Sequence, residues 1–267
     1  MEFPQNIYKQ ERLQIIMRHL EEHGRVSVNE LSDQFQVSVM TVRRDLQELE
    51  NSGWIERTHG GAVLSIRQKY RIEPPTLGRI SSMAEEKRLI AKAASNLVGK
   101  DEMFFLGAGS STLYVARELI NREDITIVTN SLLILHELAM NGKMTVIAVG
   151  GFLRRKELSL IGHFADTVLR DLHVNKVIMG MQGIHPKYGL TCDHPQELET
   201  DRTIMGISDN VIVVADHTKI GHVATSKTAP VTNASLIITT EGAPLDLVED
   251  IKAQGVDVMV IKKKREE

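Results

Sequence analysis

Two adjacent arginines, Arg43 and Arg44, lie among apolar residues that are spaced as on one face of a helix. Val42, Leu46 and Leu49 recur at i, i+4 and i+7, so they form a buried stripe and leave both arginines facing solvent or a partner. Guanidinium groups bind guanine edges and phosphates in DNA. For an isolated Arg-Arg pair, however, a solvated helix face is the better interpretation.

The elements before this helix give it the spacing of a helix–turn–helix. Apolar residues recur at helical spacing over residues 13–20, and residues 29–35 fit a second, short helix. A tight connection then leads to Ser38, whose hydroxyl can cap the third helix, and Thr41 follows in the first turn. This spacing favours the DNA interpretation, in which the third helix enters the major groove.

A glycine-rich hairpin follows the third helix. Residues 54–57 and 62–64 are short strand candidates, joined by the segment THGG. Arg57 and His59 flank a tip at Gly60 where the bare backbone can approach phosphates. The sequence therefore predicts a β-wing, with an ordinary packed hairpin as the alternative.

A second chemical pattern, MFFL-GAGSST-LYVARELI, covers residues 103–120 and predicts a strand, a glycine loop and a helix. Hydroxyls and free amides at a helix N-terminus form an anion site, so Ser110, Ser111 and Thr112 could together hold a phosphate or a carboxylate. A Gly-x-Gly turn is weak support by itself, because most such turns only connect elements. The loop has no third glycine three positions after Gly109 and no Gly-Lys-Ser/Thr ending, so we expect no nucleotide cofactor.

The elements that must position this loop are apolar runs that alternate with helical stretches from about residue 85 onward. Such runs indicate an α/β fold, a mostly parallel sheet with helices on both faces. The runs are residues 103–106, 125–128, 144–149, 176–181, 210–215, 236–240 and 256–261. Polar or glycine residues follow four of them, at 129–131, 150–151, 182–183 and 216–219. A shared pocket at the carboxyl edge is favoured over four unrelated turns and caps.

Length and composition limit the remaining possibilities. The 267 residues are predicted to form a DNA-binding domain (1–65), a linker with two prolines (66–80) and an effector-sensing domain (81–267). A net charge of −3 gives no global basic field, so any DNA contact must come from a local patch. The single cysteine, the lack of metal-type histidine spacing and the lack of a long apolar run predict a cytoplasmic protein without disulfide, metal or membrane span.

The segment VSVNELSDQFQVSVMTVRRDLQELENSGWIERTHGGAVL (26–64) closely resembles the winged helix–turn–helix signature of the DeoR family of bacterial transcriptional regulators. The TVRRDL and R-x-HGGA patterns are highly specific. The resemblance implies that seven residues approach operator DNA, namely Ser38, Thr41, Arg43, Arg44, Arg57, His59 and Gly60.

The second half resembles the sensor domain of the same family in EEKRLIAKAA (85–94), GSST (109–112), VTNS (128–131), VGG (149–151), GMQGI (180–184) and ADHTKIG (215–221). That domain is similar to the ribose-5-phosphate isomerase and CoA-transferase fold, and family members sense a phosphorylated sugar or polyol. The resemblance implies a phosphate cradle with a lysine as charge partner, formed by Gly109, Ser110, Ser111, Thr112 and Lys219. It implies a sugar-facing set formed by Asn130, Gly151, Asp193, Glu197 and Asp216.

One position departs from the family pattern. Many members begin the loop with Asp-x-Gly, whereas Gly107 holds the first position here. A carboxylate that could bond a sugar hydroxyl is missing, so the identity of the effector does not carry over from relatives.

The function that these patterns favour is a repressor of carbohydrate metabolism genes, controlled by a phosphorylated sugar or polyol and without catalytic residues. A homo-oligomer, dimer or tetramer, is expected because one winged helix covers only part of a turn of DNA. The alternative is a sugar-phosphate isomerase-type enzyme with an attached DNA-binding domain, in which Asp216, Glu197 and Lys219 would do acid–base work. A DNA domain on the same chain favours the regulator.

Overall fold

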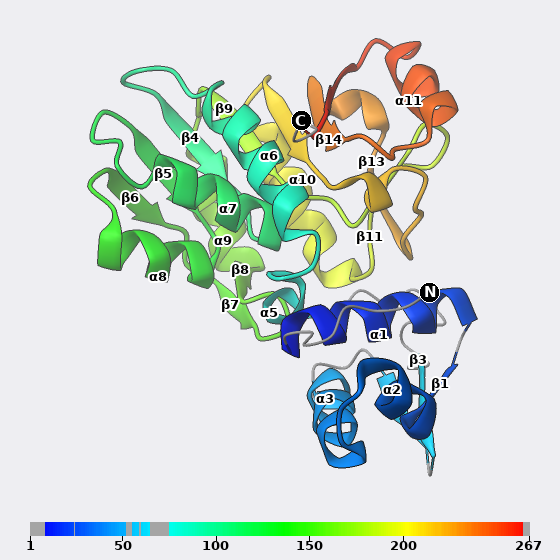
Figure 1. Ribbon diagram of the computed structural model, residues 1–267. Coiled ribbons are helices and arrows are strands. Elements are labelled where there is room, and N and C mark those ends of the chain that lie inside the picture. The colour runs from blue at the N-terminus through cyan, green and yellow to red at the C-terminus, as the bar shows by residue number, and fades with distance from the viewer. Residues whose placement is uncertain (1–8, 24, 52–54, 59, 65–74, 264–267) are drawn as a thin grey trace. The chain divides into compact units, whose positions relative to one another are not determined.

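The computed structural model describes residues 9–23, 25–51, 55–58, 60–64 and 75–263 (Figure 1). The chain divides into two compact units, residues 1–78 and residues 79–267, which are described separately. Among the described residues, no helix is both long enough and apolar enough to cross a membrane.

In the first unit, the described residues between 9 and 64 form three helices and a three-stranded antiparallel sheet with the order β1-β3-β2. Its elements are α1 (Lys9–His23), β1 (Arg25–Ser27), α2 (Val28–Phe35), α3 (Val39–Asn51), β2 (Ile55–Arg57) and β3 (Gly61–Leu64). This arrangement is a winged helix–turn–helix, as the sequence predicts. The predicted stripe of α3 is buried, because Val42 and Leu46 are fully covered and Leu49 nearly so.

The helices of this unit pack through one shared core. Ile16 and Leu20 of α1 meet Leu31 and Phe35 of α2 and the apolar stripe of α3 in that core. The amphipathic spacing of each helix directs its apolar side chains to the common interior. On the outer face of α3, Met40 and Val39 are exposed beside the polar residues.

The second unit is built on a seven-stranded parallel sheet with the order β15-β14-β12-β9-β4-β5-β6. Its strands are β4 (Met103–Leu106), β5 (Thr126–Thr129), β6 (Thr145–Ala148), β9 (Lys176–Met179), β12 (Val211–Val214), β14 (Leu236–Thr240) and β15 (Asp257–Ile261). Six of these strands fall within a predicted apolar run, and β5 overlaps the run 125–128 but ends one residue later, at Thr129. The predicted mixed α/β architecture is therefore confirmed.

Helices cover both faces of this sheet, which explains why the strands read as continuous apolar runs (Figure 1). One core joins the sheet to α6 (Ala84–Ser95), α7 (Ser110–Leu119) and α8 (Leu132–Asn141). The opposite core joins it to α9 (His163–Arg170), α10 (Leu198–Gly206) and α11 (Leu245–Lys252). Phe104 and Phe105, adjacent in β4, are fully buried in the first and the second core respectively.

Several short elements, which the sequence does not predict, add to the carboxyl edge. The hairpin of β7 (Phe152–Arg154) and β8 (Ser159–Ile161) follows β6. A small antiparallel sheet contains β10 (Gly183–His185), β11 (Gly189–Cys192) and β13 (Ser226–Ala229). The short helices η1 (Pro195–Glu197) and η2 (His217–Lys219) follow β11 and β12, whereas η3 (Val231–Asn233) precedes β14. The short helix α5 (Thr76–Arg79) spans the boundary between the two units in the sequence.

The strand order gives the sheet a switch point between β4 and β9. From β4 the chain adds β5 and β6 on one side, and it then returns to place β9 on the other side. Connections that leave two neighbouring strands in opposite directions open a crevice at their carboxyl ends, where open α/β sheets bind ligands. The loop from Gly107 to Gly109 and the segment from Gly180 to Gln182 flank this point.

Candidate functional site

Ser38 caps the third helix, as the sequence predicts. Its hydroxyl accepts a hydrogen bond from the Thr41 amide at 3.1 Å, and the hydroxyls of Ser38 and Thr41 lie 2.9 Å apart. Both side chains are thus held at the N-terminal end of α3. To bind a phosphate at this end of the helix, the two hydroxyls would have to donate hydrogen bonds to it in place of the bond between them.

Arg43 and Arg44 are exposed, and neither forms an ion pair with a described residue. The next residue, Asp45, points inward and accepts hydrogen bonds from Arg12 of α1 at 2.8 and 3.3 Å. This buried pair ties α3 to α1, and it is a contact that helical periodicity does not predict. The rigidly held helix therefore presents two unengaged cations on its outer face.

The two glycines of the wing, Gly60 and Gly61, have different surroundings. A Cβ on Gly61 would come within 1.8 Å of the Val26 carbonyl oxygen, so this glycine allows β3 to pair closely with β1. A Cβ on Gly60 would meet nothing within 4 Å, so that backbone is open to approach. Arg57 turns toward α3, where its guanidinium bonds Gln47 and lies 3.9 Å from Glu50. His59 lies outside the described residues.

The predicted phosphate cradle lies at the N-terminus of α7, beside the switch point. Gly109 adopts a φ of +149°, which side chains rarely tolerate, and this turn lets the helix begin at Ser110. Thr112 donates its hydroxyl to the Gly109 carbonyl oxygen at 3.0 Å. Among the described residues, no partner accepts from or donates to the hydroxyls of Ser110 and Ser111. First-turn amides lack acceptors within a helix, so this end is suited to an anion.

Gly107, which departs from the family pattern, fits tightly against β9. Its amide donates to the Ile178 carbonyl oxygen at 2.9 Å, and a Cβ would come within 3.1 Å of the Cβ of Met179. A larger residue would require β9 to shift. The close approach of the two strands explains glycine at this position.

Asn130 joins the cradle to the β7–β8 hairpin. Its side-chain oxygen accepts from the Ala108 amide at 3.2 Å, and its amide nitrogen donates to the Leu160 carbonyl oxygen at 3.1 Å. Gly151, at a φ of +138°, lies where a Cβ would come within 2.8 Å of the Ile161 carbonyl oxygen. Asn130 and Gly151, both predicted to face the sugar, therefore also help to hold the β7–β8 hairpin in place.

The remaining predicted residues lie on the other side of the switch point. Asp193 follows β11, and its amide donates to the side chain of Gln182, which follows β9. Asp216, buried at the end of β12, accepts from the amide of Thr218 at 3.1 Å and from its hydroxyl. Lys219 ends the same turn, with its backbone amide bonded to the Asp216 carbonyl oxygen.

Glu197 belongs to a buried charge cluster that the sequence does not predict. Its carboxylate pairs with Arg154 of β7, and the two side chains are only 12% and 9% exposed. Arg79 pairs with Glu157 in the turn of the hairpin. Burial is the largest influence that raises the pKa of Asp201 to about 7, with Glu157 adding to the rise and Arg154 opposing it.

The cluster also perturbs its neighbours. Burial lowers the pKa of the Arg154 guanidinium, although nearby carboxylates oppose this. Burial and the positive charge of Arg154 lower the pKa of His194, and burial raises the pKa of the Cys192 thiol. These residues come from β7, β11, η1 and α10, so no local spacing in the sequence could have brought them together.

A second group that sequence reasoning missed anchors α6. Glu86 accepts from the hydroxyl of Thr240 and lies 2.8 Å from Nδ1 of His217, next to Asp216. The ammonium of Lys87 donates to the carbonyl oxygens of Arg79 and Ser82, both at 2.6 Å. Both residues belong to the EEKRLIAKAA motif (85–94), so the resemblance was the only signal in the sequence that pointed to them.

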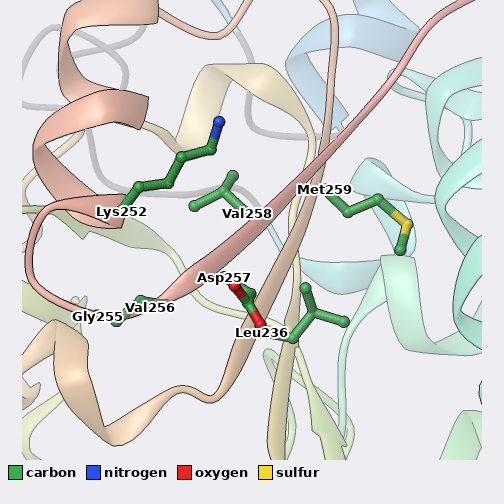
Figure 2. Close-up of a pocket in the computed structure, with 7 residues that line it drawn as sticks. All are labelled: Leu236, Lys252, Gly255, Val256, Asp257, Val258 and Met259. Carbon is green, nitrogen blue, oxygen red and sulfur yellow. The ribbon is translucent and has the colours of Figure 1, made fainter.

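A separate pocket of about 630 Å³ lies at the amino edge of the sheet, where β14 and β15 begin (Figure 2). Its lining residues are Leu236, Lys252, Gly255, Val256, Asp257, Val258 and Met259. Parallel strands have their carboxyl ends at the opposite edge, and none of the predicted site residues lines this pocket. No group of three or more metal-type side chains suited to an ion is found in the described part of the chain.

Comparison with known proteins gives two family matches. Residues 12–68 match the DeoR-like helix-turn-helix domain, and residues 82–241 match the DeoR C terminal sensor domain. Relatives that are 33% identical to this chain include the HTH-type transcriptional regulator YgbI of Escherichia coli K12 (94% of this chain, 98% of the relative) and the transcriptional repressor AccR of Agrobacterium fabrum (87% and 90%). The HTH-type transcriptional repressor GlcR of Bacillus subtilis is 30% identical (95% and 97%).

Among solved structures, ribose 5-phosphate isomerase A from Methanocaldococcus jannaschii is similar to this chain with a TM-score of 0.39 and 18% identity, over 52% of this chain and 55% of the isomerase. These three relatives are transcriptional regulators, and the match covers at least 90% of each of them. They therefore support the regulator and not the isomerase alternative. Both family matches, and relatives of this identity and coverage, show that the chain belongs to the DeoR family of transcriptional regulators.

Proposed function

We propose that this regulator represses carbohydrate metabolism genes and that a phosphorylated sugar or polyol releases it from its operator. Residues 1–65 bind the DNA, residues 66–80 link the two parts, and residues 81–267 sense the effector. In the DNA-binding part, α3 enters the major groove with Ser38, Thr41, Arg43 and Arg44, while Arg57, His59 and Gly60 of the wing approach the backbone. Such a protein acts in the cytoplasm, where the genome is.

The observation that carries the effector assignment is the N-terminus of α7 at the switch point of the sheet. Gly109 turns the chain so that α7 begins at Ser110, and the hydroxyls of Ser110 and Ser111 have no partner among the described residues. A helix N-terminus favours negative charge by about 0.3–1 kcal/mol near a surface, and by more when it is partly buried. A neutral sugar would gain none of this, so the phosphate dominates affinity and the hydroxyl contacts set identity.

Lys219 supplies the balancing charge from the other side of the switch point. It follows β12, which is separated from β4 by the single strand β9. Two strand spacings amount to roughly 10 Å, a gap that a phosphate and an extended lysine side chain together can span. The phosphate would thus lie over the carboxyl end of β9.

Catalysis is not part of the proposed function. The carboxylates that an isomerase would use are already occupied, since Asp216 caps the η2 turn and Glu197 is paired with Arg154. A general base needs a carboxylate within reach of a substrate proton and free to accept it. Incubation with pentose and hexose phosphates should therefore give no turnover.

A dimer or tetramer is the expected assembly. A single winged helix covers only part of a helical turn, and coupling two modules raises the effective concentration of the second contact. Light scattering at micromolar concentration tests this. A monomer that still binds its operator tightly contradicts it.

The Ser111→Asp variant tests the pocket, because it places a carboxylate where the phosphate binds. We expect wild-type protein to bind at least one member of a panel of pentose, hexose and polyol phosphates by calorimetry. That ligand should weaken operator binding by about 5–150-fold in gel shifts, the range of typical allosteric coupling. Ser111→Asp should bind the ligand at least 100-fold more weakly and should keep its operator affinity with or without ligand.

Thr232→Asp is the matched control, since it adds the same charge at an exposed position of η3. It should behave as wild type in both assays. A Ser111→Asp protein that binds and responds normally would show that the pocket lies elsewhere. A wild-type protein that binds none of the panel would refute the effector class itself.

A further inference from the structure

The outer face of α3 carries a large apolar side chain, Met40, between its two cations. Met40 is 57% exposed, although it belongs to a helix whose other apolar residues after Val39 are buried. Successive residues of an α-helix are rotated by about 100°, so the buried stripe lies about 120–180° around the axis from Met40, whereas Arg43 and Arg44 lie within about 60° of it. Met40 therefore lies at the centre of the outer face, with one arginine on each side.

The wing occupies the other end of the same face. The side-chain oxygen of Gln47, one turn after Arg43, accepts from the guanidinium of Arg57 in β2. The amide nitrogen of Gln47 donates to Glu50 and Asn51 at 3.1 and 3.0 Å. The backbone amide of Arg57 also donates to the carboxylate of Glu50 at 3.2 Å. These contacts hold β2 against the C-terminal half of α3, so the N-terminal turns are the part of the outer face that is open to a large partner.

The N-terminal turns are held in a fixed position. The Ser38 hydroxyl accepts from the Thr41 amide, and the buried pair between Asp45 and Arg12 ties the middle of α3 to α1. In a helix–turn–helix, the N-terminal residues of the recognition helix contact base edges in the major groove. Met40, the second residue of α3, thus lies in the part of the helix that reaches the bases.

The chemistry of the side chain determines which base it can recognise. Methionine has no hydrogen-bond donor, and its sulfur is only a weak acceptor, so Met40 cannot distinguish bases by hydrogen bonds. The C5-methyl group of thymine is the apolar group that distinguishes a base pair in the major groove, and apolar side chains recognise it by direct contact. Arg43 and Arg44 complement the phosphate charge on either side of Met40 and would hold it against the groove.

We propose that Met40 is a specificity-determining residue, which contacts the C5-methyl group of a thymine in the major groove of the operator. Each half-site then contains an A·T pair opposite the first turn of α3, next to the positions that Arg43 and Arg44 contact. This inference rests on the proposed function, because it requires α3 to lie in the major groove. It assigns a residue that neither the motifs nor the resemblance identified, since both pointed to polar residues and glycine.

Replacing single thymines of the operator by uracil is the sharpest test, because it removes one methyl group and keeps every hydrogen-bonding edge. The probe is a duplex selected from a random library by the full-length wild-type protein. We expect one thymine in each half-site at which uracil weakens wild-type binding about 3- to 5-fold in gel shifts at fixed salt, the effect of one methyl group leaving an apolar contact.

Met40→Ala should bind the thymine and uracil duplexes equally, because its side chain ends at Cβ, short of the base. Met40→Leu keeps an apolar chain that reaches the methyl group, so it should retain the penalty for uracil. Met140→Ala is the matched control, since Met140 of α8 is a methionine that is 71% exposed but lies in the second unit. It should show the full wild-type penalty. Thermal unfolding should be the same in all three variants, because the side chains removed are exposed.

The outcomes separate this inference from the proposed function. A wild-type protein that binds its selected duplex and loses no affinity at any uracil would overturn the methyl contact and leave the role of α3 intact. An equal penalty in wild type and Met40→Ala would mean that another group, such as the Thr41 methyl, contacts the thymine, and would also overturn the inference. If the wild-type protein selects no preferred sequence, the operator-binding function and this inference fall together.

Discussion

The recognition helix α3 presents Arg43 and Arg44 to solvent, whereas the β7–β8 hairpin buries Arg154 against Glu197. In the first unit, the cations proposed to bind a ligand are separate from those that hold the fold, such as Arg12. In the second unit, Glu197, which the resemblance assigns to the effector, also belongs to a group of charged side chains that packs the carboxyl edge. Function and stability should therefore be separable by mutation in the first unit, and coupled in the second.

This difference follows from what each unit has to recognise. DNA is a large external polyanion, and exposed cations on a rigid helix are sufficient to contact it. A small ligand must be enclosed, so the groups that bind it are taken out of water and must be satisfied when the ligand is absent. Pairing with a protein carboxylate, as Arg154 does with Glu197, gives a buried cation its counter-charge.

The largest effect is expected from Arg43→Ala combined with Arg44→Ala. Each well-formed arginine contact with a base contributes about 1–3 kcal/mol, so the pair should cost about 2–6 kcal/mol of operator binding, at least about 30-fold. Because neither arginine forms an ion pair with a described residue, the free energy of unfolding should change by less than about 0.5 kcal/mol. Gel shifts and urea unfolding measure the two quantities.

A control for that variant removes the same charge elsewhere. Arg170→Ala with Lys187→Ala takes two exposed cations from the second unit. It should leave operator affinity within about twofold of wild type at equal salt, because those side chains lie outside the proposed contact. An equal loss in both double variants would mean that net charge, and not α3, governs the affinity.

Asp45→Ala tests the buried pair that ties α3 to α1. Removing the carboxylate takes away the counter-charge that Asp45 provides to the buried Arg12 and should destabilise the first unit by about 3–5 kcal/mol. Trp54 is the single tryptophan and belongs to the first unit, so its fluorescence in urea reports on that unit. Glu48→Ala, which breaks an exposed pair with Lys9, should cost less than about 1 kcal/mol. Equal effects would remove the distinction between buried and exposed charge in this unit.

The two wing glycines give a smaller contrast. Gly61→Ala forces a Cβ against the Val26 carbonyl oxygen and should cost about 1–3 kcal/mol of stability, as overpacking does. Gly60→Ala meets no atom within 4 Å and should change stability by less than about 0.5 kcal/mol. Tryptophan fluorescence in urea again measures both. A Gly61→Ala protein as stable as wild type would mean that β1 and β3 separate without cost.

The sequence predicts those parts of the molecule where one physical requirement dominates a local pattern. A strand buried on both faces must be apolar throughout, so the seven runs locate the parallel sheet. A helix end needs a cap, so Ser38 is identified before α3. The three-residue strands β7 and β8 have no such pattern, because their alternation is too short to be distinguished from a loop.

The candidate site divides in the same way. The cradle at Gly109–Thr112 could be predicted, because a glycine turn and hydroxyls at a helix start are adjacent in the chain. The pairing of Arg154 with Glu197, and the proximity of Asp201 to both, depend on the return of the chain from β7 to α10. Long-range contacts of this kind carry no local signal, and only the tertiary fold reveals them.

The smallest predicted effect concerns Asp201, whose burial raises the pKa of its carboxyl group from an ordinary value of 3.8 to about 7. Between these two values the folded chain keeps a proton that the unfolded chain has lost. Stability therefore falls as pH rises from about 4 to about 7, and it levels off above pH 7. The second unit thus carries a buried acid whose ionised form it disfavours.

Asp201→Asn removes this dependence, because the amide stays neutral at every pH. Between pH 6 and pH 8 the wild type should lose about 1.4 kcal/mol of stability relative to the variant, which corresponds to about 3–6 °C in Tm. Calorimetry of the full chain at pH 5, 6, 7 and 8 measures the change. Asp209→Asn, which removes an exposed carboxylate, should show no such trend. A variant that loses stability as pH rises would mean that ionised Asp201 is a needed partner of Arg154, and the buried cluster would then resemble an ordinary ion pair.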